Sequence, residues 1–152
     1  MTIEVRNERV QDAAAIQQVH IAAFGGSAEA KLVRLISERK KALISLVAVS
    51  DDSAVGHILF SRVTIDNAPP TFNGVGLAPL AVSPEFQQQG IGSKLIWEGL
   101  ERCKQDGYDA VVVLGGPAYY SALDSSARRT LASRMNTPLM MSLWCWLCVM
   151  AR

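Results

Sequence analysis

The sequence predicts an α/β (α+β) fold, in which helices flank both faces of a mixed, mostly antiparallel central sheet. Apolar stretches rich in β-branched residues alternate with stretches whose apolar residues recur at helical spacing. Up to residue 114 their order is strand, helix, helix, three strands, helix and strand, which requires a mixed sheet. With 152 residues, 49% hydrophobic and 19% charged, the chain can bury one core.

The N-terminal elements are a short strand and two helices. Residues 3–6 alternate between apolar and polar side chains, which predicts a strand. Residues 12–24 carry apolar side chains at helical spacing, and the Gly-Gly pair that follows ends this helix. Ser27 is a suitable N-cap for a second helix over residues 28–39.

Three strands follow in the middle of the chain. Residues 44–49 and 55–63 flank a turn at residues 51–53, which predicts a hairpin. Residues 74–82 are nearly all apolar, which is typical of a strand buried on both faces. Pro79 lies inside this strand and cannot donate to a ladder. We therefore expect the strand to bulge or to part from a neighbour there.

An amphipathic helix and a buried strand come next. Apolar spacing predicts the helix over residues 93–105, and Gly107 stands in the usual position after a helix C-terminus. Residues 110–114 are an apolar run typical of a buried strand, and a further helix is expected to begin near Ala118. We expect residues 1–121 to form one domain.

Composition disfavours several classes of protein. A net charge of +1 argues against nucleic acid as a partner. No apolar run reaches the roughly 20 residues of a membrane helix, and the polar N-terminus has no signal-peptide core. An odd number of cysteines, 3, without framework spacing predicts reduced thiols and a cytoplasmic protein. No metal site is expected, because Cys145-x-x-Cys148 has no further ligands nearby.

The connection between the strand at residues 74–82 and the next helix has the features of an anion site. Gly90 and Gly92 let the backbone approach a ligand closely, while the helix dipole and its first N–H groups favour a phosphate. A simple tight turn would have the same Gly-x-Gly pattern. An unrelated nucleotide-binding site is disfavoured, because neither a Walker lysine nor a Rossmann Gly-x-Gly-x-x-Gly follows the strand.

Residues 80–93, LAVSPEFQQQGIGS, closely resemble the acetyl-CoA-binding motif of the GNAT N-acetyltransferase superfamily. That motif is an apolar strand end, then Arg/Gln-x-x-Gly-x-Gly/Ala, then a helix. Gln87, Gly90 and Gly92 occupy its defining positions, and Gln88 replaces a frequent glycine. The resemblance implies that the residues that bind acetyl-CoA are Leu80, Ala81, Val82, Gln87, Gln88, Gln89, Gly90, Ile91, Gly92 and Ser93.

The resemblance also implies a reaction. In this family the amine of an acceptor attacks the thioester of acetyl-CoA directly, and the CoA thiolate leaves. The pantetheine arm of the cofactor pairs with the strand that corresponds to residues 77–82. Tyr120 stands where the family has a tyrosine whose hydroxyl points at the sulfur, so it is the implied proton donor; a tyrosine packed on the core is the alternative. The implied acceptor is a small-molecule or peptide amine.

The sequence leaves the general base and the partners open. Glu29 lies near a helix start that borders the acceptor site in the family, but a solvated helix charge fits equally well. His57 has apolar neighbours and is expected to be packed, and His20 carries no motif. Dimers are frequent in the family, so a homodimer is an implied assembly. The alternative function is a CoA-binding or regulatory module that has lost turnover.

Residues 122–152 depart from the family pattern. They contain no glycine and one acidic residue, Asp124, where the family has Tyr-x-x-Phe/Leu-Gly-Phe and two further strands. We hypothesise that a nucleotide was lost after Ser121, because a shifted reading frame can continue from Tyr120 as YSRFGF. The strand at residues 110–114 would then lose its partner and expose an edge. A divergent but selected C-terminus is the alternative, and sequencing the gene across codon 121 distinguishes the two.

Overall fold

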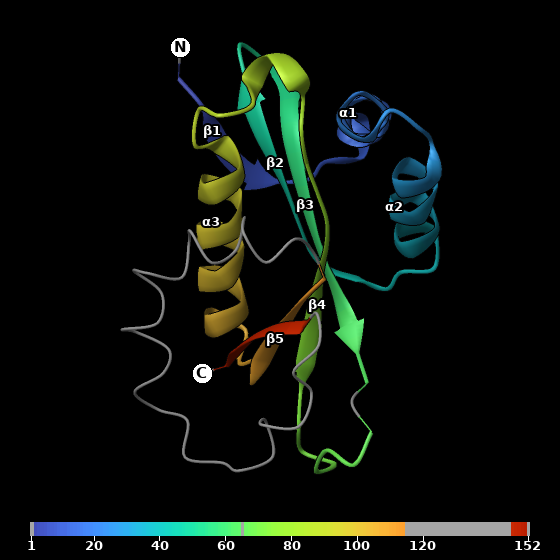
Figure 1. Cartoon of the computed structure of the whole chain (residues 1–152), viewed down its shortest axis with the longest axis vertical. Coiled ribbons are helices and arrows are strands. Elements are labelled where there is room, and N and C mark those ends of the chain that lie inside the picture. The colour runs from blue at the N-terminus through green and yellow to red at the C-terminus, as the bar shows by residue number, and fades with distance from the viewer. Residues whose placement is uncertain (1, 65, 115–146, 152) are drawn as a thin grey trace.

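The computed structural model describes residues 2–64, 66–114 and 147–151 (Figure 1). The N-terminal half contains β1 (Glu4–Asn7), the 3-10 turn η1 (Val10–Asp12), α1 (Ala13–Phe24), α2 (Ala28–Glu38), β2 (Ala42–Ser50) and β3 (Ser53–Val63). The rest contains β4 (Gly74–Val82), the 3-10 turn η2 (Pro84–Phe86), α3 (Ile91–Gln105), β5 (Ala110–Leu114) and β6 (Leu147–Ala151). The predicted bounds of β4 and β5 are confirmed, and α3 begins two residues earlier than predicted because Gly90 is its N-cap.

The strands lie side by side in chain order, from β1 to β6, in a six-stranded sheet within the described residues. Every neighbouring pair is antiparallel except β4 and β5, which are parallel and joined through α3. The predicted fold class and the order βααβββαβ are therefore confirmed. The helix expected near Ala118 lies outside the described residues.

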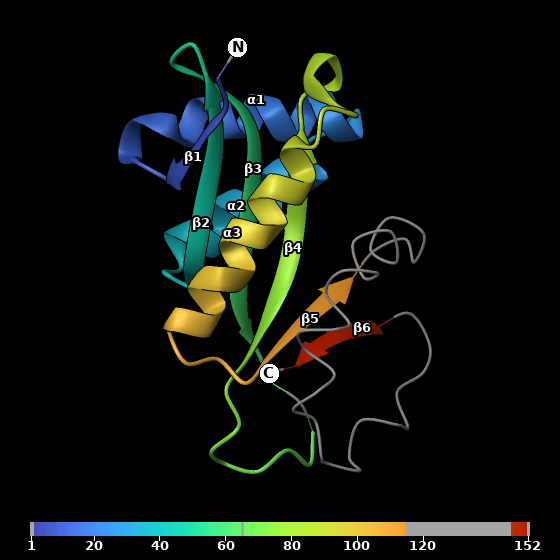
Figure 2. The same ribbon diagram turned by 90° about the vertical axis from the view of Figure 1, so that its left-hand side faces the viewer.

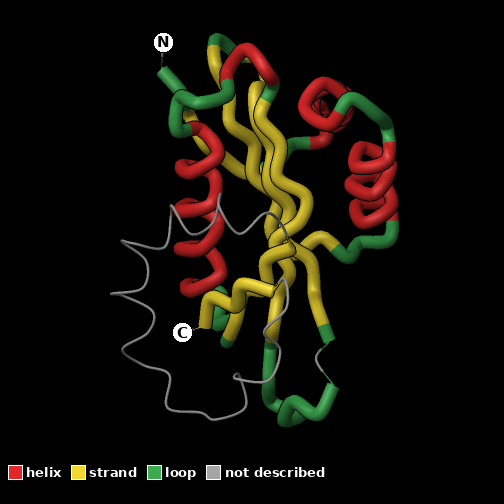
Figure 3. The backbone as a smooth tube through the Cα atoms, viewed as in Figure 1, coloured by secondary structure: helices red, strands yellow, loops and turns green. Residues whose placement is uncertain are grey.

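Helices cover both faces of the sheet, with α3 on one side and α1 and α2 on the other (Figures 1 and 3). Successive side chains of a strand point to opposite faces. In β2, Leu46 therefore joins the core under α3, whereas Val47 joins the core under α1 and α2. Because β2 and β3 are buried on both faces, their sequences read as apolar runs.

Gly99 brings α3 close to the sheet. A Cβ atom added at this glycine would lie 2.4 Å from Cε2 of Phe60, whose side chain is fully buried. Only a residue without a side chain allows this approach of the helix to β3. The apolar core under α3 therefore depends on a glycine in the middle of a helix, where glycine is otherwise unfavourable.

The strand β4 is irregular at Pro79, as predicted. Ile58 of β3 lies opposite Leu80 of β4, but Phe60 lies opposite Leu77, so β4 has one more residue than β3 between these pairs. The peptide bond that precedes Pro79 is cis. This arrangement is a bulge in the β3–β4 ladder, as is usual where a proline interrupts pairing.

The strand β4 also parts from its other neighbour. The β4–β5 ladder runs only from Gly74 to Leu77 on the β4 side. Beyond Leu77, β5 turns away from β4 (Figure 2). The expectation that this strand would bulge or part from a neighbour is therefore confirmed.

The strand β6 covers the outer edge of β5. The two strands are antiparallel, and all of β5 is paired, from Ala110 opposite Ala151 to Leu114 opposite Leu147. The expectation that β5 would lack a partner is therefore wrong. Ladder pairing uses backbone groups, which every residue except proline supplies in full, so an atypical sequence can complete a sheet.

Candidate functional site

The loop between β4 and α3 is held by its own glutamines. The side-chain amide of Gln87 donates to the carbonyl of Val82, with an N–O distance of 2.9 Å. The side-chain amide of Gln89 donates to the carbonyl of Glu85 at 3.1 Å. These two bonds tie the loop to the end of β4 and to the turn η2.

No side chain caps the N-terminus of α3. Gly90 is its N-cap, with φ of 80°, and provides no side chain to accept from the first turn. The first α-helical bond runs from the N–H of Lys94 to the carbonyl of Gly90, 2.9 Å. The N–H groups of residues 91–93 precede that bond and have no intrahelical acceptor. Together with the helix dipole, they can hold a phosphate.

The left-handed backbone at Gly90 is accompanied by open space. A Cβ atom added at this position would meet no described atom within 4 Å. Gln88, two residues earlier, also has a left-handed backbone, with φ of 60°. The chain therefore turns sharply in front of α3, with open space at the Cβ position of Gly90.

The parted edge of β4 leads directly to this loop. Beyond Leu77, β4 has no partner on its β5 side within the described residues. Leu80 and Val82 are half-buried against the core under α3, and Ala81 faces the opposite layer at 3% exposure. The hydrogen bond from Gln87 to Val82 joins this edge to the loop. Except for Tyr120, which lies outside the described residues, the predicted site residues thus lie together at one end of the sheet.

A sheet whose parallel strands part leads here to a helix N-terminus that can hold an anion. The family model of the acetyltransferase (GNAT) family matches residues 13–120. The chain belongs to this family.

Two relatives come from Escherichia coli. The chain is 43% identical over 111 residues to the uncharacterized N-acetyltransferase YjhQ of strain K12, covering 72% of the chain and 61% of YjhQ. It is 39% identical over 118 residues to the uncharacterized N-acetyltransferase YhbS of the same strain, covering 77% of the chain and 70% of YhbS. The chain thus spans about three-fifths of the length of YjhQ.

Two solved structures resemble the chain closely. A GNAT family acetyltransferase from Brucella melitensis, in complex with acetyl-CoA, matches with a TM-score of 0.75 and 39% identity, over 80% of this chain and 81% of that one. Escherichia coli YhbS, in complex with CoA, matches with a TM-score of 0.74 and 35% identity, over 82% and 71%.

The described part of the chain has neither a membrane-spanning helix nor a cluster of metal ligands. None of its helices has both the length and the apolar character needed to cross a membrane. Nor do its His, Cys, Asp and Glu side chains gather in groups of three or more that could hold a metal ion.

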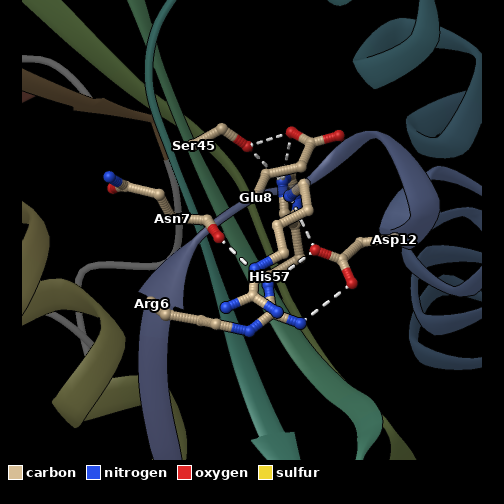
Figure 4. Close-up of polar contacts among 7 residues, drawn as sticks. Arg6, Asn7, Glu8, Asp12, Ser45 and His57 are labelled. Atoms are coloured by element: carbon tan, nitrogen blue, oxygen red, sulfur yellow. Dashed lines mark hydrogen bonds and ion pairs between the residues drawn. The ribbon is translucent and has the colours of Figure 1, made fainter.

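A chain of buried polar side chains lies under α1. His20 Nε2 lies 2.9 Å from His57 Nδ1, and His57 Nε2 lies 2.8 Å from the hydroxyl of Ser45. The Ser45 hydroxyl in turn donates to Glu8 Oε2 at 2.5 Å (Figure 4). Both histidine side chains are fully buried, whereas the Glu8 side chain is 22% exposed. The chain of bonds therefore leads from the interior to the surface.

The pKa values of His20 and Glu8 are shifted by their surroundings. Burial, reinforced by His57, lowers the pKa of His20 to about 4, so this ring is neutral at pH 7. The His57 ring and then the Ser45 hydroxyl lower the pKa of Glu8, although burial opposes them. His57 Nε2 lies 3.9 Å from Glu8 Oε2, which is beyond hydrogen-bond distance, so Ser45 is the direct donor to Glu8.

The corner that carries Glu8 is fixed by Asp12. Its carboxylate accepts two bonds from the Arg6 guanidinium, at 2.7 and 3.0 Å, and one from the backbone N–H of Arg9 at 2.7 Å. The Arg6 bonds, ahead of the Arg9 bond, lower the pKa of Asp12. Bidentate pairing of this kind orients the chain at the end of β1.

Sequence reasoning predicted a packed His57, which is confirmed, but missed the polar chain. His20 and His57 are 37 residues apart, on a helix and a strand. Their only signal in the sequence is that each histidine occupies a position with apolar neighbours, where a buried polar ring requires a partner.

Proposed function

We propose that the chain is an N-acetyltransferase, which moves an acetyl group from acetyl-CoA to the amine of a small molecule or peptide by direct transfer. The observation that carries the proposal is the uncapped N-terminus of α3 beside the parted edge of β4. The acetyl-CoA and CoA complexes of two similar proteins support acetyl-CoA as the cosubstrate.

Each part of the site has a role in this proposal. The N–H groups of Ile91, Gly92 and Ser93 bind the pyrophosphate, and the bonds made by Gln87 and Gln89 hold the loop in shape. The free backbone groups of β4 around Leu80–Val82 pair with the amides of the pantetheine arm, as in the addition of a strand to a sheet edge.

The chemistry requires a neutral amine and an acid for the leaving group. The amine nitrogen attacks the thioester carbonyl, and collapse of the tetrahedral intermediate breaks the carbon–sulfur bond. Tyr120 then donates its hydroxyl proton to the CoA thiolate, and the proton that the acylated nitrogen loses restores the Tyr120 hydroxyl. The overall products are the acetylated amine, CoA thiol and the proton that the ammonium form of the acceptor loses.

A second function is a CoA-binding or regulatory module without turnover. The observation that favours it is that the sequence after Ser121 departs from the pattern that other members of the family have there. Release of free thiol from acetyl-CoA in the presence of a panel of amines distinguishes the two functions. Binding without release on any amine supports the second.

The binding proposal is tested by thermal unfolding with acetyl-CoA, with ATP as the control. A ligand at about a hundred times its Kd adds about 2.7 kcal/mol to the stability of the native state. We expect a shift with acetyl-CoA and none with ATP. A cooperatively folded protein that shows no shift with acetyl-CoA would reject the proposed site.

A pair of glycine variants locates the ligand. Gly90→Ala and Gly107→Ala place a Cβ at similar left-handed positions, φ of 80° and 85°, and neither Cβ meets a described atom within 4 Å. Each should cost about 1–2 kcal/mol of stability. Only Gly90→Ala, at the N-terminus of α3, should also weaken acetyl-CoA binding in a calorimetric titration. Equal affinities in the two variants would place the ligand elsewhere.

A further inference from the structure

The buried chain of Glu8, Ser45, His57 and His20 crosses the sheet toward the proposed cofactor. Glu8 follows β1, Ser45 lies on β2 and His57 lies on β3. The side chain of Ser45 is hydrogen-bonded to both Glu8 and His57. His57 lies directly opposite Ala81 of β4, and α1, which carries His20, packs on both β3 and β4. The inner end of the chain is therefore beside the strand whose free edge begins after Leu77.

The direction of every proton in this chain follows from its outer end. An ionised Glu8 can only accept, so the one hydroxyl proton of Ser45 points to Glu8. Ser45 must then accept from His57 Nε2–H. In an uncharged ring this leaves His57 Nδ1 as an acceptor, so His20 donates from Nε2. A neutral His20 consequently carries a lone pair, and no proton, on Nδ1.

The Nδ1 atom of His20 makes no hydrogen bond to the described residues. It is fully buried and has no hydrogen-bond partner within the described residues. An unsatisfied buried polar atom is costly and calls for an explanation, such as a catalytic role or a bound water. Phe24 is stacked on His20, with ring centroids 6.0 Å apart, and is 47% exposed at the end of α1. The His20 ring therefore lies just beneath an exposed side chain.

We propose that His20 is the general base of the acetyl transfer, and that His57, Ser45 and Glu8 are positioning residues that carry the proton to the surface. The proposal rests on the proposed function, because these four side chains carry a proton only if an acceptor ammonium loses one. No motif of the sequence points to these residues together.

The proton transfer is balanced at each step. The acceptor ammonium gives one proton to His20 Nδ1, in direct contact or through one water, and becomes the neutral nucleophile. His20 passes its Nε2 proton to His57 Nδ1, and His57 passes its Nε2 proton to Ser45. Ser45 passes its hydroxyl proton to the Glu8 carboxylate, which releases it to solvent. Both rings must then return to the Nε2–H tautomer before the next turnover. No oxidant, metal or other co-reactant is needed.

Few other titratable groups face this chain. His57 on β3 faces His20, Glu8 at the end of β1 faces His57 and Ser45, and Asp12, paired with Arg6, acts on Glu8. The segment β4 has no titratable side chain, and α1 has none besides His20. The helix α2 turns Ala30 and Val33 inward, and Glu29 in its first turn is half-buried.

The first test measures the tautomers in the full-length protein by nitrogen-15 NMR of the histidine rings at pH 7.5. We expect a neutral His20 ring, with its proton on Nε2 and a bare Nδ1. A proton on Nδ1 of His20 overturns the proposal whether or not an acceptor amine is known.

The second test measures thiol release on an amine panel with three variants. His20→Gln keeps an N–H donor toward His57 but has no basic nitrogen, and the rate should fall about 10²- to 10⁴-fold with acetyl-CoA binding unchanged. Ser45→Ala interrupts the chain and should lower the rate less. Ser50→Ala is the matched control, because this buried β2 serine has no partner among the described residues, and it should retain the native rate.

The pH profile separates a base from a structural histidine. The native rate should level off once the base is deprotonated, whereas the His20→Gln rate should keep rising about tenfold per pH unit, because only free amine reacts. A His20→Gln protein with the native rate and profile overturns the relay and leaves the proposed function intact. If the native protein releases no thiol with any amine, the proposed function and the catalytic role of His20 both fail.

Discussion

At the scale of single residues, His20 makes the stability of the fold sensitive to mild acid. Burial holds its pKa at about 4, below the ordinary value of 6.5. Between these values the unfolded chain binds a proton that the folded chain refuses, so stability falls as the pH is lowered through this interval. Glu8 and Asp12 also make the fold less stable in acid, but at lower pH. Their pKa values are lowered, so the stability that they contribute is lost only below about pH 4.5.

We predict that the free energy of unfolding decreases by about 2 kcal/mol between pH 7 and pH 5, owing to His20. Urea titrations at several pH values measure this slope. The His20→Gln protein, which has nothing to protonate at this position, should lose most of the slope. A native protein whose stability is flat over the same interval would mean that the His20 ring is not held neutral by burial.

At the scale of elements, α3 has to meet different demands along its length. Its first turn leaves N–H groups uncapped, which favours a bound anion but contributes nothing to an isolated helix. Its middle is pressed against Phe60 through Gly99. The position of the proposed anion site relative to β4 thus depends on a packing contact farther along the same helix.

We predict that Gly99→Ala destabilises the protein by about 1–3 kcal/mol, because the new Cβ overlaps the rigid ring of Phe60. Combining it with Phe60→Leu should recover part of the loss relative to the sum of the two single changes. Glu101→Ala, on the exposed face of α3, is the control and should stay within about 0.5 kcal/mol of the native value. Additive losses in the double variant would show that Gly99 and Phe60 do not interact.

At the scale of the whole molecule, the sheet is completed by a segment far away in sequence. The strand β6 pairs along all of β5 and covers the edge that the parallel β4–β5 pair leaves exposed. An uncovered edge presents unpaired N–H and C=O groups to other chains. The C-terminal residues therefore affect both stability and association.

We predict that deleting residues 147–152 lowers the Tm and causes concentration-dependent association. Each kcal/mol lost should lower the Tm by about 2–4 °C in a domain of this size. Calorimetry and light scattering at two protein concentrations measure the two effects. A protein that lacks only Arg152, beyond the end of β6, serves as control. If the deleted protein stays as stable and monomeric as this control, the β5–β6 pairing contributes nothing in solution.

Much of the fold could be predicted because the signals are local. Apolar periodicity marks each helix and strand, and Pro79 required a break in pairing wherever its neighbours lay. The Gly-x-Gly turn before a helix indicates an anion site from properties of the backbone alone. That residues 147–151 pair with β5 could not be predicted, because pairing between backbones depends on which segments meet rather than on their side chains.

By itself, the sequence determined the order of the elements, the irregular β4 and the turn at Gly90, since each depends on residues that are neighbours in the chain. Only the tertiary structure decided that His20, His57, Ser45 and Glu8 form one hydrogen-bonded line. These side chains come from a helix, two strands and a connecting segment, and none has a preference that points to the others. Their meeting depends on the registers of β1, β2 and β3 and on the packing of α1 over them, which are properties of the folded chain.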